Sequence, residues 1–147
     1  MKFSGFVLTF ILFVALSVTT HAQVKTVKKA AHRSLGAAMA GGKKVYTAIC
    51  LACHMADGGG VPNMNPPLIQ TTYVLGDKKA LIKIVLNGFK EDVEINGQKF
   101  SNNMTPHNDL KDQEIADVLT YVRHSFGNKA SSITTAEVKK VRASSNL

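Results

Sequence analysis

The sequence contains few cysteines, and this scarcity excludes several classes of protein. Among 147 residues only Cys50 and Cys53 are cysteines, so a fold stabilised by several disulfides is excluded. No second cysteine pair is present to complete a four-cysteine zinc site. A chain of this length has room for one domain with a modest core.

Acidic residues are also scarce. Ten Asp and Glu against 18 Lys and Arg give a formal net charge of +8, which suits nucleic acid, an anionic membrane or an acidic protein partner. The basic residues occur singly and in pairs, such as Lys43-Lys44 and Lys78-Lys79, and form no long arm with interleaved aromatics. We therefore expect no nucleic-acid binding, and we assign most of these pairs to solvated surface.

A long apolar run occurs near the N-terminus, where Phe6 to Leu16 is interrupted only by Thr9. Lys2 precedes it and Thr20-His21-Ala22 follows with a small-x-small pattern, so the sequence predicts a signal peptide over residues 1–22. The run is short for a bilayer span of about 20 residues. We expect a periplasmic protein. The alternative is an uncleaved anchor, which would hold it on the periplasmic face of the inner membrane.

Residues 50–54 spell Cys-Leu-Ala-Cys-His, a C-x-x-C-H motif. Two thiols at this spacing can add across the vinyl groups of a haem, and His54 then lies beneath the iron as a ligand. A thioredoxin-like dithiol and half of a zinc site are the alternatives, but the dithiol leaves His54 without a role. The motif predicts one covalent haem c, which would form much of the core and agrees with export.

Helical patterns divide the rest of the chain. We predict a mobile linker over residues 23–40, a domain over 41–128 and a C-terminal extension with a short helix over 129–147. Apolar spacing and capping residues predict four helices: Lys43 to Cys50, Lys78 to Asn87 between Asp77 and Gly88, Asp112 to about Gly127, and a last helix from the Thr134 and Glu137 capping box to about Arg142.

Two stretches between the helices predict other structure. Residues 57–67 are rich in Gly and Pro, which predicts a loop without regular structure. Val93 to Ile95 and Gln98 to Phe100 flank Asn96-Gly97, the pattern of a β-hairpin with a two-residue type I′ turn. The hairpin leads the chain to Met104.

Together with the motif, residues 42–128 resemble a bacterial class I c-type cytochrome with a single haem. Gly42 and Tyr46 stand eight and four residues before the first cysteine, where that family has a small and an aromatic residue. In the family this glycine lets the first and last helices cross closely. The resemblance implies that Val118 and Tyr121 are the partners of these two residues.

The resemblance also implies the residues around the haem. Pro66 and Leu68 lie where the family keeps a proline whose carbonyl accepts a hydrogen bond from the axial histidine, and a leucine that packs on the haem. Met104 lies where the family places its second axial ligand. A histidine binds iron through Nε2 only if Nδ1 carries the proton, so an acceptor for Nδ1 is needed, and the Pro66 carbonyl is the candidate.

Other residues compete for the sixth ligand position. Met64 is the main competitor, but it is only ten residues from His54, in the loop expected on the proximal side, so Met104 is preferred. His107 is a possible substitute ligand or a polar residue at the rim. The sequence departs from the family pattern at Thr105, where a proline often follows the ligand, and at Lys111, where a serine usually caps the helix.

The resemblance implies an all-α fold, with three to five helices around a covalent haem and a small β-hairpin before the axial methionine. It implies an exported carrier of single electrons that cycles between Fe(III) and Fe(II) and transforms no substrate. Its partners would be redox proteins, a donor and an acceptor, with an acidic docking surface. The alternatives are a haem subunit bound permanently to an oxidase, nitrite reductase or quinoprotein dehydrogenase, and a haem peroxidase, which needs an open iron position.

Overall fold

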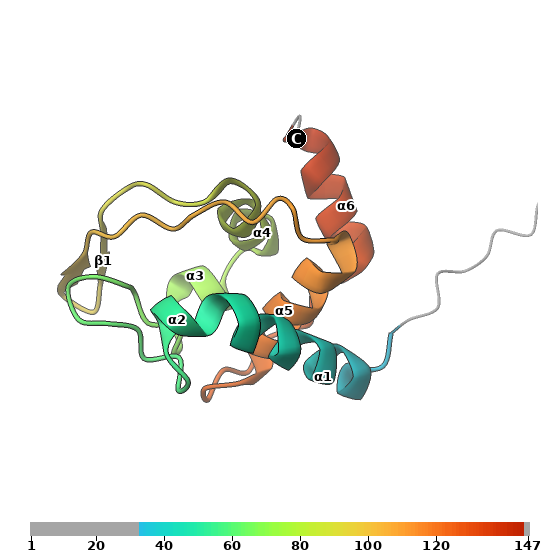
Figure 1. Cartoon of the computed structure of the whole chain (residues 1–147), viewed down its shortest axis with the longest axis horizontal. Coiled ribbons are helices and arrows are strands. Elements are labelled where there is room, and N and C mark those ends of the chain that lie inside the picture. The colour runs from blue at the N-terminus through green and yellow to red at the C-terminus, as the bar shows by residue number, and fades with distance from the viewer. Residues whose placement is uncertain (1–32, 146–147) are drawn as a thin grey trace, which may run out of the picture. The chain divides into compact units, whose positions relative to one another are not determined.

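Helices make up about half of the computed structural model, which describes residues 33–145 (Figure 1). Three contiguous elements, α1 (Leu35–Val45), the π-helical turn η1 (Tyr46–Cys50) and α2 (Leu51–His54), form one helical segment. The others are α3 (Thr72–Leu75), α4 (Lys78–Asn87), α5 (Asp112–His124) and α6 (Thr135–Ser144). The predicted all-α fold with three to five helices is confirmed for the described residues. The predicted signal peptide and residues 23–32 of the predicted linker lie outside them.

The first helix begins earlier than the sequence pattern indicated. Ser34 caps it by accepting a hydrogen bond from the Ala37 backbone, and the helix runs from Leu35 through Gly41 and Gly42 without a break. The prediction that the first helix starts at Lys43 was therefore wrong, because residues 35–40, which were assigned to the linker, already belong to this helix. The two glycines weaken helix propensity by up to about 1 kcal/mol each, but Gly42 is buried against α5, and tertiary packing outweighs that cost.

The crossing of α1 and α5 organises the domain. A Cβ atom on Gly42 would collide with the backbone carbonyl of Asp117 and lie 2.6 Å from Cβ of Tyr121, so only glycine permits this approach. One turn later, Tyr46 is buried and its ring lies 5.4 Å from that of Tyr121 and 5.3 Å from that of Phe126. The expected contact with Tyr121 is present, but the α5 backbone nearest to Gly42 is that of Asp117 and not of the expected Val118.

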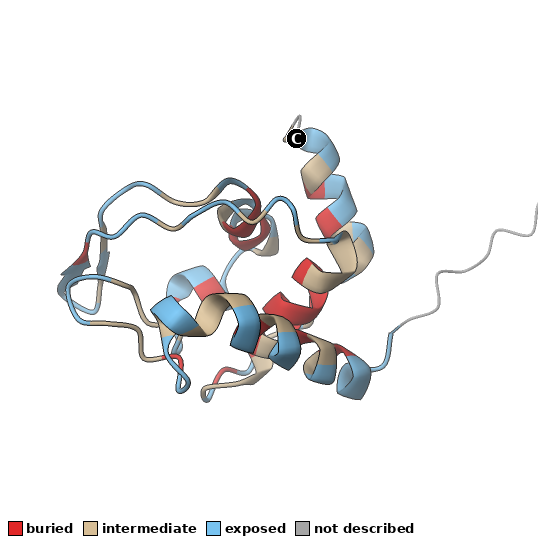
Figure 2. Cartoon of the chain, in the orientation of Figure 1, coloured by how far each residue is buried: buried red, intermediate tan, exposed pale blue. Residues whose placement is uncertain are grey.

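Helices α4 and α5 supply most of the remaining core (Figure 2). Asp77 caps α4 by accepting a 2.7 Å hydrogen bond from the Ala80 amide, and Gly88 ends the helix with φ +73°. Both predicted ends are therefore correct. The buried residues of α4 and α5 that form the core are Leu81, Ile82, Val85, Leu86, Ile115, Ala116, Val118, Leu119 and Val122.

The predicted hairpin is confirmed, with β1 (Val93–Ile95) antiparallel to β2 (Gln98–Phe100) and Val93 opposite Phe100. The turn residues Asn96 and Gly97 both have positive φ angles, 53° and 79°, as a type I′ turn requires. After the hairpin the chain returns across α4 towards α5 (Figure 1).

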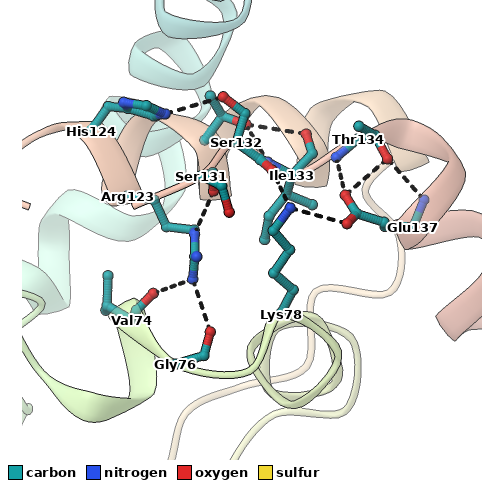
Figure 3. A network of polar contacts seen from close by, with 11 residues as sticks. Val74, Gly76, Lys78, Arg123, His124, Ser131, Ser132, Ile133, Thr134 and Glu137 are labelled. Carbon is teal, nitrogen blue, oxygen red and sulfur yellow. Dashed lines mark hydrogen bonds and ion pairs between the residues drawn. The ribbon is translucent and has the colours of Figure 1, made fainter. Parts of the chain in front are cut away.

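The C-terminal extension is attached to the domain by a polar network (Figure 3). The buried guanidinium of Arg123 donates to the carbonyl oxygens of Ser131, Val74 and Gly76. Lys78 Nζ on α4 donates to the Ser132 carbonyl at 2.6 Å and to Glu137 of α6 at 3.1 Å.

Helix α6 begins with the predicted capping box. The Glu137 amide donates to Thr134 Oγ1, and Glu137 Oε2 accepts from the Thr134 amide. The helix runs two residues beyond the expected end at Arg142 and buries Val138 and Val141 in the core. Within residues 33–145, no helix combines the length and apolarity needed to cross a membrane.

Candidate functional site

His54 is the last residue of α2, and its ring is fixed by one hydrogen bond. Its Nδ1 lies 3.0 Å from the carbonyl oxygen of Pro66. A carbonyl only accepts hydrogen bonds, so Nδ1 carries the proton and Nε2 retains its lone pair. Burial lowers the pKa of His54 and outweighs the opposing effect of the Pro66 carbonyl. The imidazole is therefore held neutral, with Nε2 ready to bind a metal.

The loop after His54 folds back so that Pro66 can reach it. The Gly60 amide donates to the His54 carbonyl, and the Leu68 amide donates to the Gly58 carbonyl at 2.8 Å. Gly60 has φ +69°, and a Cβ atom there would lie 2.7 Å from the Pro66 carbonyl oxygen. The glycine-rich loop predicted from the sequence thus brings the Pro66 carbonyl against the His54 ring.

A cavity of about 300 Å³ lies beside His54. Its walls come from the C-x-x-C-H motif, the loop after it, α4, the hairpin, the segment around Met104 and α5. Most of the lining is apolar. All six predicted site residues line this cavity: Cys50, Cys53, His54, Pro66, Leu68 and Met104.

Met104 is held in place by strand-like pairing with Phe89. The Met104 amide donates to the Phe89 carbonyl at 2.8 Å, and the Phe89 amide donates to the Met104 carbonyl at 3.0 Å. Gly88 makes this pairing possible, because a Cβ atom there would collide with the Met104 carbonyl and crowd Pro106. Three residues further on, the His107 amide donates to the Val85 carbonyl of α4 at 2.9 Å.

The competing methionine, Met64, is placed differently. Its side chain is 48% exposed and is not part of the cavity wall. Its backbone carbonyl accepts from the Asn102 amide, which ties the loop after the motif to the segment after the hairpin. His107 does line the cavity, whereas His124 pairs with Ser132 at the end of α5.

The donor groups around the cavity fit a haem better than a bare metal ion. Two free thiols are present, with Cys53 exposed and Cys50 half-buried. Burial, followed by the influence of Cys53, raises the pKa of Cys50 to about 11, so its thiol is protonated at neutral pH. Within residues 33–145, no three His, Cys, Asp or Glu side chains gather to hold a metal ion. Two thiols, a neutral imidazole and a thioether around an apolar cavity are the groups that attach and ligate a c-type haem.

Sequence reasoning missed Asn128, which supports the loop that carries Pro66. Its buried side chain accepts from the Gln70 amide at 2.7 Å and donates to the carbonyls of Leu68 at 2.9 Å and Val122 at 2.8 Å. A lone asparagine beside a glycine is typical of a turn. No signal in the sequence could have shown that it reaches back to residues 68–70.

The helical fold, the motif and the cavity together define a c-type cytochrome. The sequence model of the cytochrome c family matches residues 39–126, more than half of the chain, and this protein belongs to that family. It therefore carries covalently bound haem c and takes part in electron transport. The resemblance inferred from the sequence is confirmed.

The relatives include small cytochromes and parts of larger enzymes. A cytochrome c-552 of Thermus thermophilus is 36% identical over 118 residues, covering 74% of this chain and 79% of the relative. The cytochrome c subunit of the quinone-dependent alcohol dehydrogenase of Gluconacetobacter polyoxogenes is 33% identical over 111 residues, covering 69% of this chain and 22% of that subunit. The gluconate 2-dehydrogenase cytochrome c subunit of Pantoea cypripedii is 33% identical over 99 residues, covering 65% of this chain and 22% of that subunit.

Proposed function

We propose that this protein is an exported, freely diffusing carrier of single electrons, with His54 and Met104 as the axial ligands and Cys50 and Cys53 as the thioether attachments. The haem supplies one-electron Fe(III)/Fe(II) chemistry. One observation carries the proposal: these four side chains line a single apolar cavity, and the Pro66 carbonyl leaves Nε2 of His54 free to bind. The apolar N-terminal run supports export.

The surroundings of the two ligands suit repeated electron transfer. His54 is fixed by the Pro66 carbonyl and Met104 by its pairing with Phe89, so neither ligand has to move when the charge on the iron changes. A neutral, soft thioether favours the reduced iron and raises the reduction potential relative to a second imidazole. A position filled by Met104 also leaves no open site for a substrate. We therefore propose an electron carrier that transforms no substrate.

The test of the ligand assignment uses two methionine variants of the exported haem protein. Methionine bound to oxidised haem iron gives a weak absorption band at the red edge of the spectrum. We expect this band to disappear in Met104→Ala and to persist in Met64→Ala, because Met64 lies outside the cavity wall. Loss of the band in Met64→Ala alone would overturn the assignment.

A second candidate function is that of a subunit bound permanently to a dehydrogenase. The relatives that are named as dehydrogenase subunits favour it, and so does an exposed apolar surface beside the cavity. Tyr73 lines the cavity while 39% exposed, and Ile69 nearby is 40% exposed. Size-exclusion chromatography of the protein from its native host separates the two functions. A carrier elutes near its own mass of 15.9 kDa or below, and a subunit co-elutes with a dehydrogenase.

A further inference from the structure

We propose that Arg142 on α6 is a positioning residue for the segment that follows Met104, and that it keeps the methionine side of the cavity closed. The inference rests on the proposed role of Met104 as axial ligand. It concerns a helix outside the family match, which ends at residue 126, whereas α6 begins at Thr135. The C-terminal extension would then contribute directly to the haem site.

The guanidinium of Arg142 is bound entirely to one short stretch of chain. Its Nε donates to Asp112 Oδ1 at 2.7 Å, its Nη1 to the Asn108 carbonyl at 2.7 Å and its Nη2 to the Leu110 carbonyl at 2.6 Å. The side chains of Arg142 and Asp112 are only 22% and 26% exposed. Hydrogen bonds from a charged donor are among the strong ones, and the planar fork of arginine fixes the geometry of all three.

This stretch of chain forms part of the cavity wall. Leu110 lines the cavity, and its amide donates to the carbonyl of His107, which also lines it. The segment from Met104 to Asp112 is thus held at its start by Phe89, in its middle by Val85 of α4 and at its end by Arg142. Release of the last attachment would leave Leu110 free to move away from the cavity.

Helix α6 is itself firmly fixed, so Arg142 acts from a rigid support. Val138 and Val141 on the same helix are 0% and 5% exposed in the core. At the other end of the extension, Lys78 of α4 binds the Ser132 carbonyl and Glu137 (Figure 3). Movement at Arg142 therefore requires breaking its own contacts and not merely a tilt of the helix.

The experiment compares Arg142→Ala and Arg142→Lys with Lys139→Ala in the oxidised holoprotein. Lys139→Ala removes a positive charge from an exposed position of the same helix. The first readout is native-state hydrogen exchange at the amides of His107 and Leu110, relative to Leu86 in the core, which reports global opening. The second is the rate at which added imidazole displaces the methionine, followed by loss of the red absorption band.

We expect Arg142→Ala to accelerate both readouts about tenfold, equivalent to about 1.4 kcal/mol, while exchange at Leu86 changes less. Arg142→Lys, which keeps the charge without the fork, should lie between Arg142→Ala and wild type, and Lys139→Ala should equal wild type. Unchanged exchange at Leu110 would overturn the proposal, and so would faster exchange with an unchanged imidazole rate. Absence of the band from the wild type would instead overturn the assignment of Met104.

Discussion

The hydroxyl of Tyr46 donates a 2.7 Å hydrogen bond to the backbone carbonyl of Met55, the residue directly after His54. Met55 has φ 62°, a left-handed conformation that costs energy for any residue other than glycine. The same carbonyl accepts a longer hydrogen bond from the Gly58 amide. A buried phenol on the first helix therefore stabilises the strained turn that ends the haem-binding motif.

Tyr46→Phe should lower the free energy of unfolding by about 1 kcal/mol, because the Met55 carbonyl loses its shorter hydrogen bond. Urea unfolding of the holoprotein measures the change. Tyr121→Phe is the matched control from the same aromatic cluster, since its hydroxyl makes no hydrogen bond among the described residues. Equal effects of the two substitutions would show that the hydrogen bond to Met55 contributes nothing.

Gly42→Ala should destabilise the protein by about 3 kcal/mol or more, at the upper end of the cost of overpacking, because the added Cβ meets the Asp117 backbone and not a flexible side chain. Gly36→Ala on the same helix has open space around its Cβ and should stabilise by up to about 1 kcal/mol. Thermal unfolding of both variants measures the two changes in stability. A mild effect at Gly42 would mean that α1 and α5 can separate without loss of stability.

Glu137 should make stability depend on pH at the acid end. Burial alone would raise the pKa of Glu137, but its hydrogen bonds to the Thr134 amide and to Lys78 outweigh burial and lower it. A carboxylate whose pKa is lower in the folded state stabilises the fold above its ordinary pKa, and this contribution disappears as the pH falls through the folded value.

Glu137→Gln should therefore cost stability at pH 7 and nothing at a pH below the folded pKa. The cost should be below about 1 kcal/mol, because the Glu137 side chain is 39% exposed and solvent screens the ion pair with Lys78. Urea midpoints of both proteins, measured in steps from pH 7 into acid, give the difference. A difference that persists undiminished in acid would contradict the assignment.

The haem should remain with the polypeptide after extraction with acidified acetone, because both thiols border the cavity and neither is in a disulfide. Cys50→Ala and Cys53→Ala should each retain haem through the remaining thioether, and the double variant should release it to the solvent. Colour lost from the wild type would exclude covalent attachment.

Reduction of the protein by an acidic donor should slow steeply as salt is added. Removal of residues 1–22 takes away Lys2, so the formal net charge of the chain becomes 8 − 1 = +7. Two ionised haem propionates lower this net charge by about two. Charge attraction between such partners acts within a Debye length of about 10 Å at 0.1 M salt. Stopped-flow kinetics over a range of ionic strength measure the effect, and a rate that is flat or rises with salt would rule out steering.

The lysines expected to steer the encounter lie in the last turn of α1 and in or just before the hairpin, and all are exposed: Lys43, Lys44, Lys90 and Lys99. Their replacement by glutamine should reduce the salt dependence through the association rate more than the dissociation rate. Lys139→Gln on α6 is the control and should change neither.

The features predicted correctly from the sequence depend on residues that are close together along the chain. The C-x-x-C-H motif, the Asn96-Gly97 turn and the Thr134 and Glu137 capping box each specify local geometry through a few neighbouring side chains. The family resemblance added the distant residues Pro66 and Met104, which no local pattern would have related to His54.

The features that were missed depend on contacts between distant segments. Gly41-Gly42 indicates a break, and only the surface of α5 explains why α1 continues through it. Arg142 binds carbonyls some 30 residues earlier, and any backbone offers such acceptors, so its partners have no sequence signal. The same is true of Asn128 and Leu68.

The continuous helical segment from Leu35 to His54 also determines where a tether would join the domain. At 1.5 Å per residue its two ends are about 25–30 Å apart, with the cysteines and the axial histidine at the end remote from residue 35. A linkage to an electrode or a bilayer attached at residue 33 would join the domain at the opposite end of this helix from the haem-binding motif. Immobilisation in that orientation would keep the haem-binding end unobstructed for electron exchange.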